Sequence, residues 1–302
     1  MVAAVESTPA IGANATSYNF GGYGSLDDFL AATSSLDLKL FEAKDAALVD
    51  GRPVAATQKE SREGKRGLLF WVAESLSRRP VDYFEFGVMS CKSFNRVLAW
   101  TPSPDARFYG FDTFEGLPEP WVRQFGDGSV RVSRTAGDLK AAHPPAVYDS
   151  RATLFKGLFQ ETLPEALQTA FPSGRQADRP LFINIDCDIY SGALYVLTSM
   201  HTLLRSGDLV YFDEFYDVMN EFSAFNDYIR AYGTKTWFTP VARAYDGVLF
   251  RIELPPQPDV MVVDRRSTSY LARMQEYLRS RMALRKRRNP GFDQPGSASG
   301  PG

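Results

Sequence analysis

From residue 82 onward, short apolar runs alternate with segments of helical spacing, and this alternation constrains the fold more than any other feature of the sequence. The runs are DYFEFG (82–87), RFYGFD (107–112), ATLFKG (152–157), PLFINID (180–186) and GDLVYFDE (207–214). Segments such as SFNRVLAW and ETLPEALQTAF lie between them and carry apolar residues at helical spacing. The pattern predicts βαβ units, and therefore a mostly parallel sheet with helices on both faces.

Two further apolar segments follow the fifth run. TKTWFTPVAR and DGVLFRIEL are separated by a turn around residues 244–247, and they predict a C-terminal antiparallel hairpin. The expected architecture is an α/β fold with a mostly parallel, seven-stranded sheet, in which five parallel strands are joined by two strands at the edge.

The expected core at 81–254 is preceded by helical segments at 25–80. SLDDFLAATSS begins with a capping serine, Ser25, and ESREGKRGLLFWVAESLSRR places Leu68, Leu69, Val72 and Leu76 at helical spacing. We expect these helices to form a cap over the substrate or contacts between subunits. Residues 1–24 are expected to form a flexible arm, residues 255–288 a helix with a basic end, and residues 289–302 a disordered tail.

Composition and charge exclude several classes of protein. The 302 residues carry a formal net charge of -2, and six of the 34 basic residues lie between 279 and 288, so the rest of the chain is acidic. A nucleic-acid partner is therefore not expected, although the basic segment keeps a nucleic-acid substrate as an alternative. No apolar stretch approaches the roughly 20 residues that cross a bilayer. Cys91 and Cys187 are too few for a disulfide framework, and we expect a cytoplasmic protein.

Polar residues and glycines close all five predicted parallel strands. In such sheets ligands bind at the carboxyl ends of the strands. The residues there are Glu85, Gly87, Asp112, Lys156, Gly157, Asp186, Asp188, Asp213 and Glu214. A glycine turn before a helix, followed by an acidic residue that ends the next strand, predicts a nucleoside-containing cofactor. The turn lacks the other glycines of G-x-G-x-x-G, so a plain strand-to-helix turn is the alternative.

Five motifs occur in a characteristic order: FEFGV, GFDTFEGLPEPW, LFKGLFQETLP, FINIDCDIYSGALYVL and LVYFDEF. Together they resemble the macrocin O-methyltransferase family of class I S-adenosylmethionine-dependent methyltransferases. The resemblance spans residues 81 to about 252. It implies a Rossmann-like fold and S-adenosylmethionine-dependent methylation of a hydroxyl on a small molecule, such as a sugar or another polyhydroxylated metabolite.

The resemblance also implies roles for individual residues. The cofactor would contact Glu85, Gly87, Ser93, Asp112, Thr113, Phe114, Gly157 and Asp186, with Asp112 holding the ribose. A magnesium ion would be bound by Asp186, Asp213 and Glu214, although Glu214 stands where the antibiotic-sugar enzymes of the family have aspartate. Such an ion would bind two acceptor hydroxyls and favour the loss of a proton from one of them. Asp186 and His143 are the candidates for catalytic residues.

Other polar residues have structural and functional interpretations. Asp188 is expected to cap a helix that starts near Ser191. His201 falls inside a predicted helix at 191–205, and a packed or surface role is favoured over catalysis. Glu221 is expected to begin a helix after the fifth strand, where it would complement the helix dipole or approach the site. A second interpretation of the chain is a cofactor-binding interaction protein without turnover, and homo-oligomers through the N-terminal arm are also considered.

Overall fold

The computed structural model describes residues 21–49, 52–125, 127–141 and 147–255. Nearly all of the predicted N-terminal arm lies outside these residues. The predicted tail at 289–302 lies outside them as well, and so does the predicted C-terminal helix apart from Pro255.

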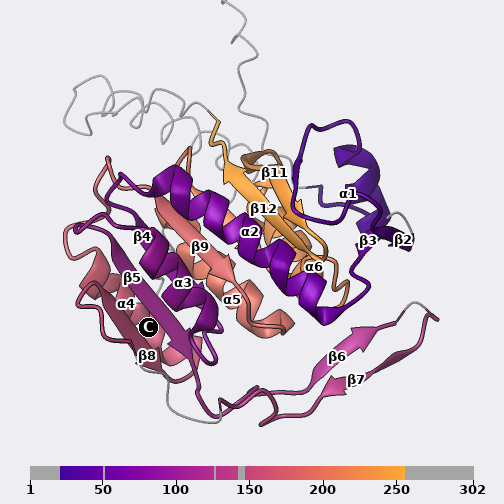
Figure 1. Ribbon diagram of the computed structural model, residues 1–302, viewed down its shortest axis with the longest axis horizontal. Helices are drawn as coiled ribbons and strands as arrows, with labels where there is room; N and C mark the ends of the chain where they lie inside the picture. The colour runs from indigo at the N-terminus through magenta and orange to yellow at the C-terminus, as the bar shows by residue number, and fades with distance from the viewer. Residues whose placement is uncertain (1–20, 50–51, 126, 142–146, 256–302) are drawn as a thin grey trace, which may run out of the picture. The chain divides into compact units, whose positions relative to one another are not determined.

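An eight-stranded sheet with the order β1-β11-β12-β10-β9-β4-β5-β8 forms the centre of the fold (Figure 1). The strands are β1 (Lys39–Leu40), β4 (Asp82–Phe86), β5 (Arg107–Asp112), β8 (Ala152–Lys156), β9 (Leu181–Ile185), β10 (Leu209–Phe212), β11 (Phe238–Ala244) and β12 (Gly247–Ile252). β12 runs antiparallel to both of its neighbours, β10 and β11, and the other pairs are parallel. The predicted α/β, Rossmann-like sheet is confirmed.

Two details of the sheet differ from the prediction. A strand of two residues, β1, pairs in parallel with β11 and brings the number of strands to eight. The hairpin turn lies between Ala244 and Gly247 as predicted, but β12 is inserted between β10 and β11 and is not itself at the edge. A strand of two residues carries no recognisable alternation, so the sequence did not reveal β1.

The register aligns the carboxyl ends of the central strands. Phe86 on β4 pairs with Phe111 on β5 and with Ile185 on β9, and Ile185 pairs in turn with Phe212 on β10. Because these strands are parallel, the residues that follow them lie along the same edge of the sheet. This alignment sets the position of the candidate site.

Helices cover both faces of the sheet, as predicted. Figure 1 shows α2 (Gln58–Leu76) and α3 (Lys92–Trp100) on the near face, with α4 (Phe159–Ala170), α5 (Tyr190–Met200) and α6 (Glu221–Tyr232) behind. Alternate residues of β4 supply the two cores, since Tyr83 packs in the cluster with α2 and α3 and Phe84 in the other. Helix α1 (Leu26–Thr33) is capped by Ser25, as predicted, and its Phe29 belongs to the same cluster as Phe84.

Several short elements were not predicted. β2 (Ala47–Val49) pairs with β3 (Arg52–Val54), and β6 (Trp121–Gln124) pairs with β7 (Val130–Arg134) in a hairpin that extends away from the sheet in Figure 1. Two 3₁₀ turns, η1 (His201–Leu203) and η2 (Lys235–Trp237), replace the end of a predicted helix and the start of a predicted strand. Within the described ranges, every helix is too short or too polar to cross a bilayer.

Candidate functional site

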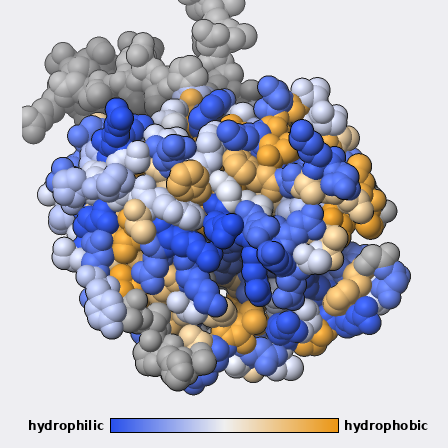
Figure 2. Space-filling view, in the orientation of Figure 1, coloured by the Kyte–Doolittle hydropathy of each residue, from blue (hydrophilic) through white to orange (hydrophobic). Residues whose placement is uncertain are grey.

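A cavity of about 1170 Å³ opens at the carboxyl ends of the parallel strands. In Figure 2, hydrophilic residues gather around a hollow in the middle of the face that carries α2 and α3. Of the predicted site residues, its wall contains Gly87, Ser93, Asp112, Thr113, Gly157, Asp186, Asp213 and Glu214. Glu85 and Phe114 are not on the wall, and His143 lies outside the described residues. The fold therefore brings most of the predicted site together.

Gly87 makes the approach of β4 to β9 possible. Its φ is +95°, in the left-handed region, and a Cβ at this position would lie 1.7 Å from the carbonyl oxygen of Asp186. Only glycine satisfies both conditions. The chain then passes through Met89 and Cys91, which also have positive φ, before α3 begins.

Glu85 lies beneath the cavity and is fully buried. Its carboxylate accepts hydrogen bonds from the hydroxyls of Tyr83 and Ser93, and burial raises its pKa. Because side chains alternate along β4, Glu85 points toward the face covered by α3 rather than out of the strand end. It orients Ser93, and Ser93 lies on the wall.

Asp112 joins the two loops that form one side of the cavity. Its Oδ1 accepts the N–H of Phe114 at 2.6 Å, and its Oδ2 accepts the N–H of Met89 at 2.8 Å. Burial raises the pKa of this carboxyl group. Each carboxylate oxygen has a second lone pair for a ligand. Phe114 packs its ring against the core cluster of α2 and α3, which explains its place behind the wall.

The loop after β5 is held at both ends. The Thr113 hydroxyl donates to the carbonyl of Gly116 at 2.6 Å, and the N–H of Leu117 donates to the carbonyl of Asp138 at 2.8 Å. Glu115 pairs with Lys140 and with Lys156, and these two ammonium groups lower the pKa of Glu115 to about 2. The loop is therefore attached to the end of β8 and to the return segment after β7.

Lys65 was not predicted as a site residue, yet it lies among the predicted magnesium ligands. Its Nζ is 2.6 Å from Oδ2 of Asp186 and 2.6 Å from Oδ2 of Asp213. The Tyr211 hydroxyl donates to the other oxygen of Asp213 at 3.0 Å. The helical spacing of the sequence could have indicated Lys65. This residue lies one helical turn before Leu68 and Leu69, and therefore on the face of α2 that packs against the sheet.

Glu214 is not a partner in this ion pair. Its side chain is hydrogen-bonded to Asp188, and its N–H donates to Oε2 of Glu221 at 3.0 Å. Burial raises the pKa of Asp188 to about 7 and raises the pKa of Glu214 well above its usual range. The predicted cap is wrong: α5 is preceded by Ile189 without a side-chain cap, because Asp188 has a φ of +63° and bonds to Glu214 instead.

The predicted magnesium site does not fit this arrangement. Within the described part of the chain, no three His, Cys, Asp or Glu side chains are grouped so that they could hold a metal ion. An ammonium group lies between Asp186 and Asp213, and the third predicted ligand, Glu214, bonds to a different carboxyl group. The spacing of the carboxylates along the sequence could not show that a lysine from another element lies between them.

The remaining candidate residues are Glu221, His201 and the two cysteines. Glu221 is the first residue of α6, as predicted, and burial raises its pKa. His201 is not on the cavity wall; its Nδ1 is 2.8 Å from the Tyr228 hydroxyl and its ring stacks on Trp237. Cys91 and Cys187 are both buried and free, and burial raises their thiol pKa, that of Cys91 to about 12.

The β6–β7 hairpin supplies part of the wall that the sequence did not reveal. Trp121 and Arg123 of β6 line the cavity. Both are held by Asp217 of the loop after β10: the indole N–H donates to Oδ2 at 2.8 Å, and the Arg123 guanidinium lies 3.2 Å from the same oxygen. The amide of Asn220 donates to the carbonyl of Val122 at 2.7 Å.

The solved structures to which this chain is similar include three that are described as methyltransferases. The crystal structure of CalS11, a calicheamicin methyltransferase, has 21% identity and a TM-score of 0.48, and covers 65% of this chain and 80% of that one. The O-methyltransferase NovP has 17% identity and a TM-score of 0.45, with 67% and 84% covered. An O-methyltransferase from Bacillus cereus in complex with SAH has 12% identity and a TM-score of 0.37, with 76% and 97% covered.

Sequence comparison provides the family. No curated protein matches this chain. The family model described as macrocin-O-methyltransferase (TylF) matches residues 78–251, which include β4 and nearly all of β12. Since this match covers more than half of the sequence and contains the strand ends that form the cavity, the chain belongs to the macrocin O-methyltransferase family.

Proposed function

We propose that this protein transfers the methyl group of S-adenosylmethionine to a hydroxyl oxygen of a small polyhydroxylated molecule, such as a sugar or another secondary metabolite. The observation that carries this proposal is the cavity of about 1170 Å³ at the ends of five neighbouring strands. Pockets for a single drug-sized ligand measure about 300–1,000 Å³. This volume suits a cofactor together with an acceptor.

The cofactor would lie along the carboxyl ends of β4, β5 and β8. Gly87 and Ser93 would adjoin the methionine part, because both lie on the cavity wall next to the end of β4. Asp112 would accept the ribose hydroxyls with the lone pairs that its two backbone hydrogen bonds leave free. Thr113 and Gly157 would adjoin the adenosine. Glu85 and Phe114 would support these residues from behind.

The chemistry would be a direct displacement at the methyl carbon. The acceptor oxygen forms a bond to this carbon, the carbon–sulfur bond breaks, and S-adenosylhomocysteine leaves with the bonding electrons. The hydroxyl proton passes to a base, for which we propose Asp186, since this carboxylate lines the cavity at the end of β9. The protein's contribution would be alignment, exclusion of water and removal of this proton. His143 remains a predicted base outside the described residues.

Calorimetry with S-adenosylhomocysteine tests cofactor binding. We expect saturable binding to the full chain and at least about tenfold weaker binding to Asp112→Ala, because loss of a hydrogen bond to a charged group costs about 1.5–3 kcal/mol. Asp105→Ala, which removes an exposed carboxylate before β5, serves as the matched control and should bind like the unaltered protein. Absence of binding, or equal affinity of Asp112→Ala and the control, would contradict the proposal.

Turnover separates an enzyme from a protein that only binds the cofactor. Methylated product from a panel of sugars and other polyhydroxylated acceptors is expected with S-adenosylmethionine. A protein that binds S-adenosylhomocysteine but methylates none of these acceptors would favour the interaction protein. Methylation of RNA with strong salt dependence would favour the nucleic-acid alternative.

A further inference from the structure

The bridge formed by Lys65 lies at the floor of the cavity, between the ends of β9 and β10. The ammonium group contacts one oxygen of Asp186 and one of Asp213, at 2.6 Å each. The side chains of Lys65, Asp186 and Asp213 are 20%, 19% and 18% exposed, so all three are largely withdrawn from water. Two such carboxylates repel each other unless a cation lies between them.

The rest of the fold determines where this ammonium lies. At the N-terminal end of α2, Oε1 of Glu60 accepts the hydroxyl of Tyr245 at 2.7 Å, which attaches the helix to the β11–β12 turn. One residue before Lys65, a Cβ on Gly64 would lie 2.4 Å from the carbonyl oxygen of Phe41. Helix α2 can therefore approach the β1 edge closely. Lys65 is presented by a helix that is held on both sides of it, since Leu68 and Leu69 are buried immediately after it.

A divalent ion would have to displace this group. Magnesium requires oxygen ligands at about 2.0–2.1 Å in nearly octahedral geometry. The Oδ2 atoms of Asp186 and Asp213 are already bonded to Lys65, and the second oxygen of Asp213 accepts the hydroxyl of Tyr211. The Glu214 carboxyl group, which would complete the set, is bonded to Asp188.

We propose that Lys65 is the resident cation of this site and takes the place of a divalent metal. Its ammonium neutralises one of the two carboxylate charges, joins the ends of β9 and β10, and holds Asp186 in a fixed orientation at the floor of the acceptor pocket. Lys65 is thus a positioning residue, and methyl transfer by this chain needs no added metal. This inference rests on the proposed methyltransferase function.

Manganese binding provides a readout that does not depend on turnover. The full chain, treated with EDTA and saturated with S-adenosylhomocysteine, is titrated with Mn²⁺ while the signal of the free ion is followed by electron paramagnetic resonance. We expect no saturable site below about 1 mM in the unaltered protein, because the ammonium repels the ion. Lys65→Ala removes this charge and opens space beside two carboxylates, so its affinity for Mn²⁺ should rise at least about tenfold. Lys65→Arg, which keeps the charge, should behave like the unaltered protein.

Thermal melting supplies a second measurement. The melting temperature with and without about 10 mM MgCl₂ should change for Lys65→Ala only, since a ligand of the native state stabilises it. If Lys65→Ala does not fold, Lys65→Met/Asp213→Asn removes the two opposite charges together and should fold, while losing activity because Asp186 is no longer held. Saturable Mn²⁺ binding to the unaltered protein, with activity lost in EDTA and restored by the metal, overturns the proposal. Failure of every form to bind S-adenosylhomocysteine would instead refute the proposed function.

Discussion

At the residue scale, the loops at the strand ends are built from backbone conformations that most residues avoid. Gly87 has a φ of +95°, and Met89, Phe114 and Asp188 also have positive φ without being glycine. Such conformations cost free energy and persist where the surrounding contacts enforce them. They gather here because three loops must turn sharply close to each other at one edge of the sheet. The FEFGV motif predicted a close approach at Gly87, and the structure identifies the carbonyl of Asp186 as the group approached.

Gly87→Ala should therefore destabilise the protein more than the same change at an ordinary left-handed glycine. We expect a loss of about 2–5 kcal/mol in the free energy of unfolding, from left-handed strain of about 1–2 kcal/mol and overpacking of about 1–3 kcal/mol. Gly207→Ala is a closely matched control, because Gly207 has a φ of +93° and nothing lies within 4 Å of the position that its Cβ would occupy. Gly207→Ala should reduce the free energy of unfolding only by the left-handed strain. Urea unfolding measures both, and equal losses would show that the contact with Asp186 is unimportant.

His201 is expected to make stability depend on pH. Burial lowers its pKa below the usual 6.5. A histidine with a lowered pKa in the folded state favours the neutral form, so its contribution is complete above about pH 6.5 and is lost as the pH falls toward the folded pKa. The melting temperature of the unaltered protein should therefore decrease more between about pH 7.5 and pH 5.5 than that of His201→Phe. Parallel curves for the two proteins would contradict this expectation.

At the scale of elements, the sequence pattern predicted the central strands closely, but it did not predict the β2–β3 and β6–β7 hairpins. β5 has the predicted bounds of 107–112, and β4, β8 and β9 begin or end within one residue of theirs. The apolar runs of β4 and β9 are buried on both faces, which leaves a strong pattern. β6 and β7 are short, β7 is largely exposed, and long-range contacts with Asp217 and Asn220 hold β6. Such contacts leave no periodicity in the sequence.

Asp217→Ala should affect the acceptor more than the cofactor. The substitution removes the partner of Trp121 and Arg123, which form the wall near the hairpin, while the loop around Asp112 keeps its own hydrogen bonds. We expect KM for the acceptor to rise about tenfold or more, because hydrogen bonds to charged groups contribute about 1.5–3 kcal/mol. Binding of S-adenosylhomocysteine should change less than about twofold. Equal losses for both ligands would mean that Asp217 supports the whole site.

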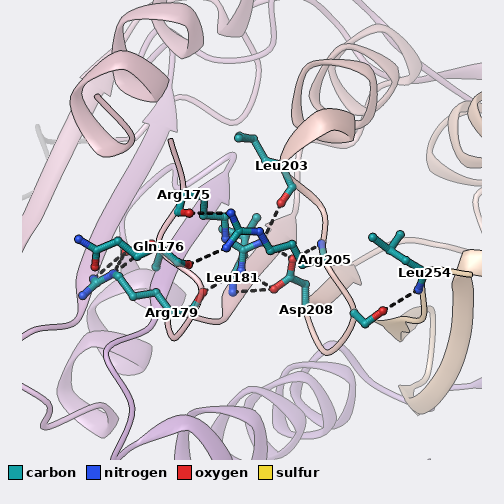
Figure 3. A network of polar contacts seen from close by, with 10 residues as sticks. Arg175, Gln176, Arg179, Leu181, Leu203, Arg205, Asp208 and Leu254 are labelled. Atoms are coloured by element: carbon teal, nitrogen blue, oxygen red, sulfur yellow. Dashed lines mark hydrogen bonds and ion pairs between the residues drawn. The ribbon is translucent and has the colours of Figure 1, made fainter. Parts of the chain in front are cut away.

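At the scale of the whole molecule, the carboxyl ends and the amino ends of the parallel strands differ in what they carry. The carboxyl edge carries the cavity, whereas the amino edge carries a buried network of ion pairs. Figure 3 shows Arg175 and Arg205 around Asp208, the residue before β10. Arg175 donates to both carboxylate oxygens of Asp208, and the N–H groups of Leu181 and Arg205 also donate to them, at 3.0 and 2.7 Å. The side chains of Arg175 and Asp208 are 2% and 3% exposed.

Asp208→Asn should lower stability without changing the site. Removing one partner of a buried ion pair costs about 3–5 kcal/mol, because the other charge stays buried without compensation. Thermal and urea unfolding should show this loss, while the affinity for S-adenosylhomocysteine stays within about twofold. Asp178→Asn, an exposed substitution near the same edge, is the control and should change stability by less than about 0.5 kcal/mol. A large change in cofactor affinity would show that the two edges are coupled.

The sequence by itself determined the central strands and main helices in their order along the chain, the family, and which polar residues end the strands. These properties follow from local patterns, because apolar periodicity and glycine turns can be recognised in short stretches of consecutive residues. Only the tertiary structure decided how those residues face one another. It paired Glu214 with Asp188, and it placed Lys65 between Asp186 and Asp213. The physical reason is that each of these contacts joins different elements of the fold, whose distances are set by the packing of helices on the sheet and not by any spacing along the sequence.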